Sequence, residues 1–140
     1  MTSNVEAPET ENRKVVLSTL WMFAMFNYLY ADFFSMIFNS TAIRSIAAGM
    51  TQGVVLGWAV VMETAIAMIL LSRILRYRAN RWANIVIGVL HTASVGWTLS
   101  GSMPQPYYMF FATVEIVCTL SIVWYAWSWR PSAAPAVDRA

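Results

Sequence analysis

Residues 54–76 read VVLGWAVVMETAIAMILLSRILR, an apolar run of helix-forming length with one acid, Glu63, near its middle. Two arginines, Arg73 and Arg76, stand at its end. A helix of about 20 apolar residues crosses the hydrocarbon core of a bilayer. A charged side chain at the centre of such a helix costs roughly 2.5–3.5 kcal/mol on insertion scales. We therefore expect the rest of the chain to be arranged around Glu63.

The composition favours a membrane protein of one domain. Hydrophobic residues make up 59% of the 140 residues and charged residues only 11%, whereas about 25% is usual for soluble domains. The net charge of +2 is too small for a nucleic-acid-binding protein. The single cysteine, Cys118, excludes an internal disulfide and paired-thiol redox chemistry within the chain.

Three more runs of similar length accompany the first, so the predicted spans are 15–38, 54–72, 83–100 and 107–128. We predict an all-α integral membrane four-helix bundle over residues 15–129. Disordered cytoplasmic tails are expected at 1–14 and 130–140, and a short interfacial helix at 41–50. Asn80 is a candidate N-cap for the third span.

The basic residues indicate the orientation of these spans. Eight of the nine lie in the two tails and in the connection between the second and third spans, and only Arg44 lies on the other side. Because cytoplasmic loops carry an excess of Lys and Arg, both termini are predicted to be cytoplasmic.

Each predicted span carries one titratable side chain. At a rise of about 1.5 Å per residue, Asp32, Glu115, His91 and Glu63 lie about 9, 12, 13 and 15 Å from the outer ends of their helices. We expect them to face the bundle interior and contact one another, with at least one of Glu63 and Glu115 protonated at neutral pH, or both sharing a proton or cation with His91. A structural hydrogen-bond hub is the alternative for Asp32, and a satisfied core histidine for His91. The supporting polar residues are Asn27, Tyr28, Ser94, Thr98 and Thr119.

Three segments carry a resemblance: LYADFFSM at 29–36, AMILLSRILRYRANRWANI at 67–85, and YYMFFATVEIVCTLSIVWYAW at 107–127. Over residues 15–127 the chain resembles an uncharacterised family of small bacterial four-helix membrane proteins, which is loosely similar to the DoxX-like group. The resemblance implies a multi-pass protein of the bacterial inner (plasma) membrane. It also implies an association with membrane redox systems, including quinone-linked ones, and hence a lipophilic redox partner. DoxX-like relatives with thiol chemistry need paired cysteines, and this chain has only Cys118.

These features predict a carboxylate/histidine site for a small lipophilic ligand such as a quinone, in a redox-linked role. A proton- or cation-coupled transporter acting as an oligomer is one alternative, and an accessory subunit of a larger membrane complex is another. No dedicated metal site is predicted, because Gly88 occupies the position three before His91 where di-metal bundles carry Glu. A three-ligand metal site at Glu63, His91 and Glu115 stays open, as does catalysis. The expected partners are membrane lipids, a lipophilic small molecule, and a second copy or a larger complex.

Overall fold

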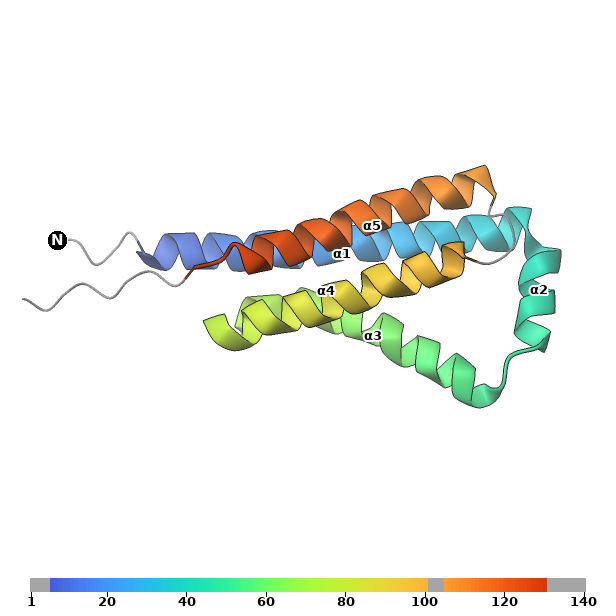
Figure 1. The fold of residues 1–140 in the computed structure, drawn as a ribbon, viewed down its shortest axis with the longest axis horizontal. Coiled ribbons are helices and arrows are strands. Elements are labelled where there is room, and N and C mark those ends of the chain that lie inside the picture. The colour runs from blue at the N-terminus through green and yellow to red at the C-terminus, as the bar shows by residue number, and fades with distance from the viewer. Residues whose placement is uncertain (1–5, 101–104, 131–140) are drawn as a thin grey trace, which may run out of the picture.

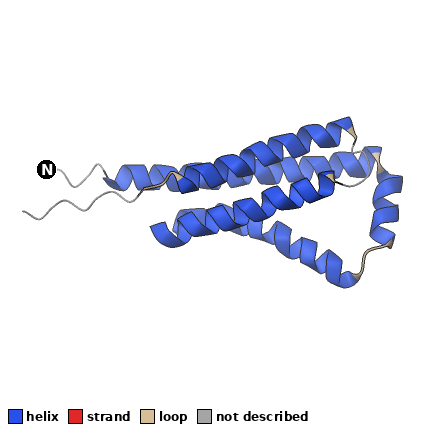
Figure 2. Cartoon of the chain, in the orientation of Figure 1, coloured by secondary structure: helices blue, strands red, loops and turns tan. Residues whose placement is uncertain are grey.

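The computed structural model describes residues 6–100 and 105–130. This part of the chain contains five α-helices and no strand, so the all-α prediction is confirmed (Figure 2). The helices are α1 (Glu6–Phe38), α2 (Ser40–Ala48), α3 (Gln52–Ile74), α4 (Tyr77–Leu99) and α5 (Pro106–Trp127).

Helix α1 begins at Glu6, so much of the segment expected to be a disordered tail is helical. Ion pairs between successive turns stabilise this extension: Arg13 with Glu9 at 3.4 Å and Lys14 with Glu11 at 3.1 Å. Such pairs on an exposed helix contribute a few tenths of a kcal/mol each. The predicted tails at 1–5 and 131–140 lie outside the described residues.

Helix α4 begins at Tyr77 rather than at residue 83, which leaves only Leu75 and Arg76 between α3 and α4. The N-cap position is Arg76, so the assignment of Asn80 as the N-cap is wrong. Asn80 lies in the first turn of α4, and its Nδ2 donates to the Ser72 carbonyl at 2.6 Å. That carbonyl belongs to the last turn of α3, where the helix itself supplies no donor. Asn80 therefore caps the end of α3.

Helices α1 and α4 each run beside α5. Helix α3 diverges from α4 toward its own N-terminal end, where α2 crosses (Figure 1). Helix α1 packs against α5 and α3, and α4 packs against α5 and more briefly against α3. The N-terminus of α1, the α3–α4 connection and the end of α5 lie at one end of the molecule (Figure 1). Below, this end is called the basic end, because it carries most of the arginines.

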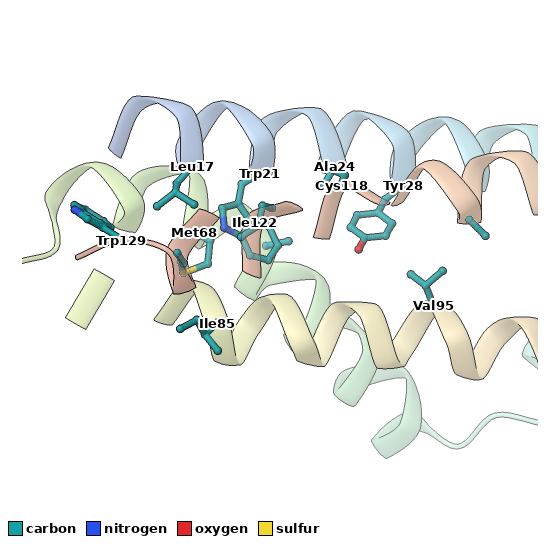
Figure 3. Close-up of a cluster of buried hydrophobic side chains, with 13 residues drawn as sticks. Leu17, Trp21, Ala24, Tyr28, Met68, Ile85, Val95, Cys118, Ile122 and Trp129 are labelled. Atoms are coloured by element: carbon teal, nitrogen blue, oxygen red, sulfur yellow. The ribbon is translucent and has the colours of Figure 1, made fainter. Parts of the chain in front are cut away.

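The core lies between α1, α3, α4 and α5 (Figure 3). Leu17, Trp21, Met68 and Ile122 are fully buried there. Helices α4 and α5 approach most closely at Gly88, where an added Cβ would lie 2.7 Å from Cγ2 of Val123. Small residues allow such close helix contacts.

Two of the described helices, α3 and α5, are long and apolar enough to cross a membrane, judged by length and composition. The other two long helices contain more polar groups. In α4 these include the fully buried Asn80, Asn84 and His91.

Candidate functional site

His91 is the centre of a hydrogen-bonded chain that joins three helices. Its imidazole is 0% exposed and bonds at both nitrogens. Nδ1 lies 3.2 Å from the Tyr28 hydroxyl of α1, and Nε2 lies 3.1 Å from Oγ1 of Thr64 in α3. The Tyr28 hydroxyl is directed toward α4 (Figure 3). The edge of Trp21 packs against the same imidazole, with ring centroids 5.5 Å apart.

The direction of this chain follows from Thr64. Its hydroxyl donates its single proton to the Val61 carbonyl at 2.6 Å, so its oxygen accepts from Nε2–H of His91. Nδ1 is then the acceptor for the Tyr28 hydroxyl. In the neutral imidazole these contacts give the Nε2–H tautomer, and the Tyr28 oxygen keeps its lone pairs for another donor.

Glu115 is the buried carboxyl of this layer. It is 5% exposed, and its Oε1 has no hydrogen-bond partner among the described residues. It lies close enough to Tyr28, Tyr108 and Asp32 to interact with each of them electrostatically. A buried polar atom without a partner is uncommon in folded proteins and calls for an explanation. Of the four predicted titratable residues, the structure thus buries His91 and Glu115.

Asp32 and Glu63 are exposed rather than buried. Asp32 is exposed on α1, one turn beyond Tyr28. Glu63 is also exposed, so the expectation that it faces the interior beside His91 and Glu115 is wrong. Helix geometry gives the reason: Glu63 and the buried Ala65 are two residues apart and therefore about 200° apart around α3. Thr64, not Glu63, is the residue of α3 that reaches His91.

The predicted supporting residues also divide into those that join the buried layer and those that do not. Within the described residues, the side chains of Asn27 and Ser94 bond only to carbonyls of their own helices, those of Phe23 and Leu90, both at 2.9 Å. Thr98 accepts from the Tyr108 hydroxyl at 2.8 Å, near the opposite end of the bundle from the arginines.

Thr119 belongs to the buried layer. It is fully buried and bonds to the Glu115 carbonyl at 2.9 Å and to the Thr92 hydroxyl at 2.7 Å. It thereby links α5 to α4 one turn from the Glu115 carboxyl.

The alternative metal site is not formed. Nowhere in residues 6–100 and 105–130 do three His, Cys, Asp or Glu side chains come close enough to hold an ion. Glu63 faces away from His91, and both imidazole nitrogens of His91 are already hydrogen-bonded.

Sequence reasoning missed a second buried cluster, which lies nearer the basic end. Asn84 Oδ1 accepts from Trp21 Nε1 at 2.7 Å and from the Ser72 hydroxyl at 3.2 Å. Asn84 Nδ2 donates to Oδ1 of Asn80 at 2.6 Å. All four side chains are fully buried. The i, i+4 spacing of the two asparagines was the available signal, and the N-cap interpretation of Asn80 obscured it.

Two surface grooves border α1, and neither contains His91 or Glu115. The α1–α3 groove is lined by Ser18, Met22, Ile66, Ile69, Leu70 and Arg73. The α1–α5 groove is lined by Leu20, Val117, Leu120, Ser121, Trp124 and Tyr125.

A family model described as "Family of unknown function (DUF6326)" matches residues 7–135. No curated protein and no solved structure matches the chain.

Proposed function

Because the chain belongs to the DUF6326 family of unknown function, we propose a function from its own polar contacts. The protein is a multi-pass membrane protein that binds the polar head of a small lipophilic ligand, such as a quinone, beside Glu115, Tyr28 and His91. The redox-linked role is part of the same proposal and follows the loose DoxX-like resemblance.

The distribution of apolar surface supports the membrane location. Only 11% of the apolar window of α3 is buried within the protein, whereas a core helix of a soluble protein would be mostly buried. Large apolar side chains on other helices are equally uncovered, including Phe110 at 64% and Leu29 at 62% exposed. An exposed apolar surface of this extent is typical of contact with lipid.

The basic end supports the proposed orientation in the bacterial inner membrane. Arg13 of α1 donates to the Tyr125 carbonyl, and Arg81 of α4 donates to the Trp127 carbonyl. These contacts hold the start of α1, the start of α4 and the end of α5 together. We assign this end to the cytoplasm, because Lys and Arg concentrate on that side.

The observation that carries the ligand proposal is the unpartnered Oε1 of Glu115. In its protonated form this carboxyl can donate to a carbonyl oxygen of a ligand, as a quinone head would offer. The Tyr28 oxygen, which donates onward to His91, keeps a lone pair free to accept from a ligand. A bound head group would thus satisfy a polar atom that the described protein leaves without a partner.

The divergence of α3 suggests the route of entry. The half of α3 nearer α2 diverges from α4 (Figure 1). In that half, an added Cβ at Gly57 would meet no atom within 4 Å. We propose that a lipid-soluble molecule reaches the Tyr28–His91–Thr64 chain from the bilayer along this side.

Retention of a lipophilic ligand tests the proposal. The protein is purified in a mild detergent, its lipids are extracted, and ultraviolet-absorbing quinones are quantified per mole of protein. Glu115→Leu should reduce retention about tenfold, since it leaves the ligand carbonyl buried without its donor, at a cost of about 1–3 kcal/mol.

Glu63→Leu is the matched control, because it removes a carboxyl that faces outward from α3. It should leave retention unchanged. Gently purified protein that carries no quinone and takes up none when a quinone is added would overturn the proposal.

Proton-coupled transport is a second candidate, favoured by the continuous Tyr28–His91–Thr64 chain across three helices. Proton flux in proteoliposomes that falls in Tyr28→Phe would support it. Flux equal to that of empty liposomes would exclude it.

A further inference from the structure

The α1–α3 groove has apolar walls and a cation at one end. It holds about 360 Å³ between α1 and α3, which lies within the size range of small-molecule sites. Its one other polar residue, Ser18, is buried and donates its hydroxyl to the Ile69 carbonyl at 2.7 Å. The walls therefore offer methyl and methylene groups along most of their length.

Arg73 occupies the basic end of this groove. Ile66, Leu70 and Arg73 follow one stripe of α3 at helical spacing, so the groove runs along the helix axis for about 10 Å before it reaches the guanidinium. Arg73 is exposed and has no hydrogen bond or ion pair with any residue in the described ranges.

Two other arginines at this end, Arg13 and Arg81, are already engaged. Arg13 donates to the Tyr125 carbonyl and lies over the Tyr125 ring at 5.0 Å. Arg81 donates to the Trp127 carbonyl and lies over the Trp127 ring at 5.7 Å. Their charge stabilises the C-terminal end of α5, where the helix dipole is negative. Arg73 has no such structural role.

The α1 wall of the groove continues toward the basic end to a second cation, Lys14, one turn before Ser18. Lys14 is 17% exposed and its partner Glu11 is 66% exposed. Surface pairs of this kind contribute at most about 1 kcal/mol, so a stronger anion can draw Lys14 away. The groove thus combines an apolar channel with positive charge at its cytoplasmic end.

We propose that the α1–α3 groove binds one anionic phospholipid of the inner leaflet. Its acyl chain lies along Met22, Ile66 and Leu70, and its phosphate contacts Arg73 with Lys14 beside it. Basic pockets between transmembrane helices on the cytoplasmic side are suited to such head groups. The inference rests on the membrane location of the proposed function, but not on the ligand site at Glu115.

Native mass spectrometry of the full chain tests this site. Detergent-solubilised protein is incubated with equimolar phosphatidylglycerol and phosphatidylcholine of identical acyl chains. We expect one phosphatidylglycerol to be retained in preference. Arg73→Gln should lower its retention about fivefold, which corresponds to about 1 kcal/mol per basic residue. Arg78→Gln, at an exposed arginine of the same end that lines neither groove, should leave retention unchanged.

A second pair of variants tests the apolar part without changing charge. Ile66→Trp fills the α1–α3 groove and should abolish lipid retention, whereas Val117→Trp fills the α1–α5 groove and should not. Equal loss in Arg73→Gln and Arg78→Gln would show a diffuse surface charge and overturn the site. Equal retention of both phospholipids would also overturn it.

This test separates the two proposals. Glu115→Leu should leave phosphatidylglycerol retention unchanged, and Arg73→Gln should leave quinone retention unchanged. The wild type could carry no quinone and still prefer phosphatidylglycerol, with that preference lost in Arg73→Gln. This outcome would support the lipid site and overturn the quinone site. A protein that stays in aqueous solution without detergent would overturn the membrane location and this site together.

Discussion

The imidazole of His91 makes both of its hydrogen bonds to side chains of other helices, Tyr28 of α1 and Thr64 of α3. The back-bond from Thr64 to the Val61 carbonyl determines which imidazole nitrogen carries the proton. A single hydroxyl in one helix therefore sets the tautomer in a second helix and the donor direction of a tyrosine in a third. Fully satisfied buried networks of this kind rigidify a core.

The tautomer can be measured because the chain contains only one histidine. In protein labelled with ¹⁵N-histidine we expect the NMR resonances of a protonated Nε2 and an unprotonated Nδ1. Tyr28→Phe should shift the Nδ1 resonance and lower the free energy of unfolding by about 1–3 kcal/mol, because Nδ1 loses its donor. Tyr30→Phe, at an exposed tyrosine of α1, is the control and should change neither quantity. A protonated Nδ1 in the wild type would contradict the direction derived from Thr64.

Asn84 provides a second prediction at the residue scale. Asn84→Leu keeps the number of side-chain heavy atoms but removes the hydrogen-bond partner of Trp21 Nε1 and of Asn80 Oδ1. We expect the free energy of unfolding to fall by about 1–3 kcal/mol, as measured by denaturant titration in detergent. Asn27→Leu makes the same change at a residue bonded only to its own helix, and it should cost less than about 0.5 kcal/mol. Equal losses in the two variants would show that the cluster carries no special stability.

At the scale of the elements, α4 and α5 are held at close range while α3 is held mainly at one end. Gly88 allows the α4–α5 approach. Near the basic end, Ser72 of α3 bonds to Asn80 and Asn84 of α4. Midway along α3, Thr64 bonds to His91 of α4. Beyond Thr64 toward Gln52 it contributes no buried residue. The freedom of this half of α3 is what the proposed ligand route depends on.

Two glycines of α4 allow a matched test of the close approach. Gly88→Leu would force side-chain atoms into Val123 of α5, and we expect a loss of about 1–3 kcal/mol or more in stability from overpacking. Gly96→Leu adds the same atoms where a Cβ meets nothing within 4 Å, and should be neutral within about 0.5 kcal/mol. Thermal unfolding of the two purified variants distinguishes the sites. A neutral Gly88→Leu would mean that α4 and α5 lie farther apart than described.

At the scale of the whole molecule, the arginine-rich end and the end crossed by α2 differ in chemistry. The basic end collects the start of α1, the α3–α4 connection and the last turn of α5, with Arg13 and Arg81 bonded to carbonyls of α5. The opposite end carries Arg44 as its one cation among the described residues. This asymmetry is the basis for the proposed orientation.

Cysteine labelling in intact cells tests that orientation. Ser45→Cys in α2 should react with a membrane-impermeant maleimide from outside, whereas Ala79→Cys at the start of α4 should react only after permeabilisation. Both positions are exposed. The native Cys118 is buried and serves as the internal control, since it should stay unlabelled in either case. Labelling of Ala79→Cys in intact cells would reverse the assigned orientation.

The positions of the long helices could be predicted from the sequence because helix formation depends on local runs of apolar residues. His91 and Glu115 could be predicted to be buried because a titratable side chain inside an apolar helix needs shielding. Glu63 could not be placed in the same way. Helix α3 is apolar around most of its circumference, so no periodicity shows which side meets its neighbours.

The sequence by itself determined an all-α protein, the approximate helix bounds, and a set of polar side chains too costly to leave in an apolar environment. Only the tertiary structure decided which of these side chains meet. It placed Thr64 rather than Glu63 against His91, turned Asn80 from a predicted N-cap into a cap for α3, and left Oε1 of Glu115 unpartnered. The physical reason is that helix formation depends on neighbours within one turn, whereas the rotation of each helix about its axis is set by packing across the bundle.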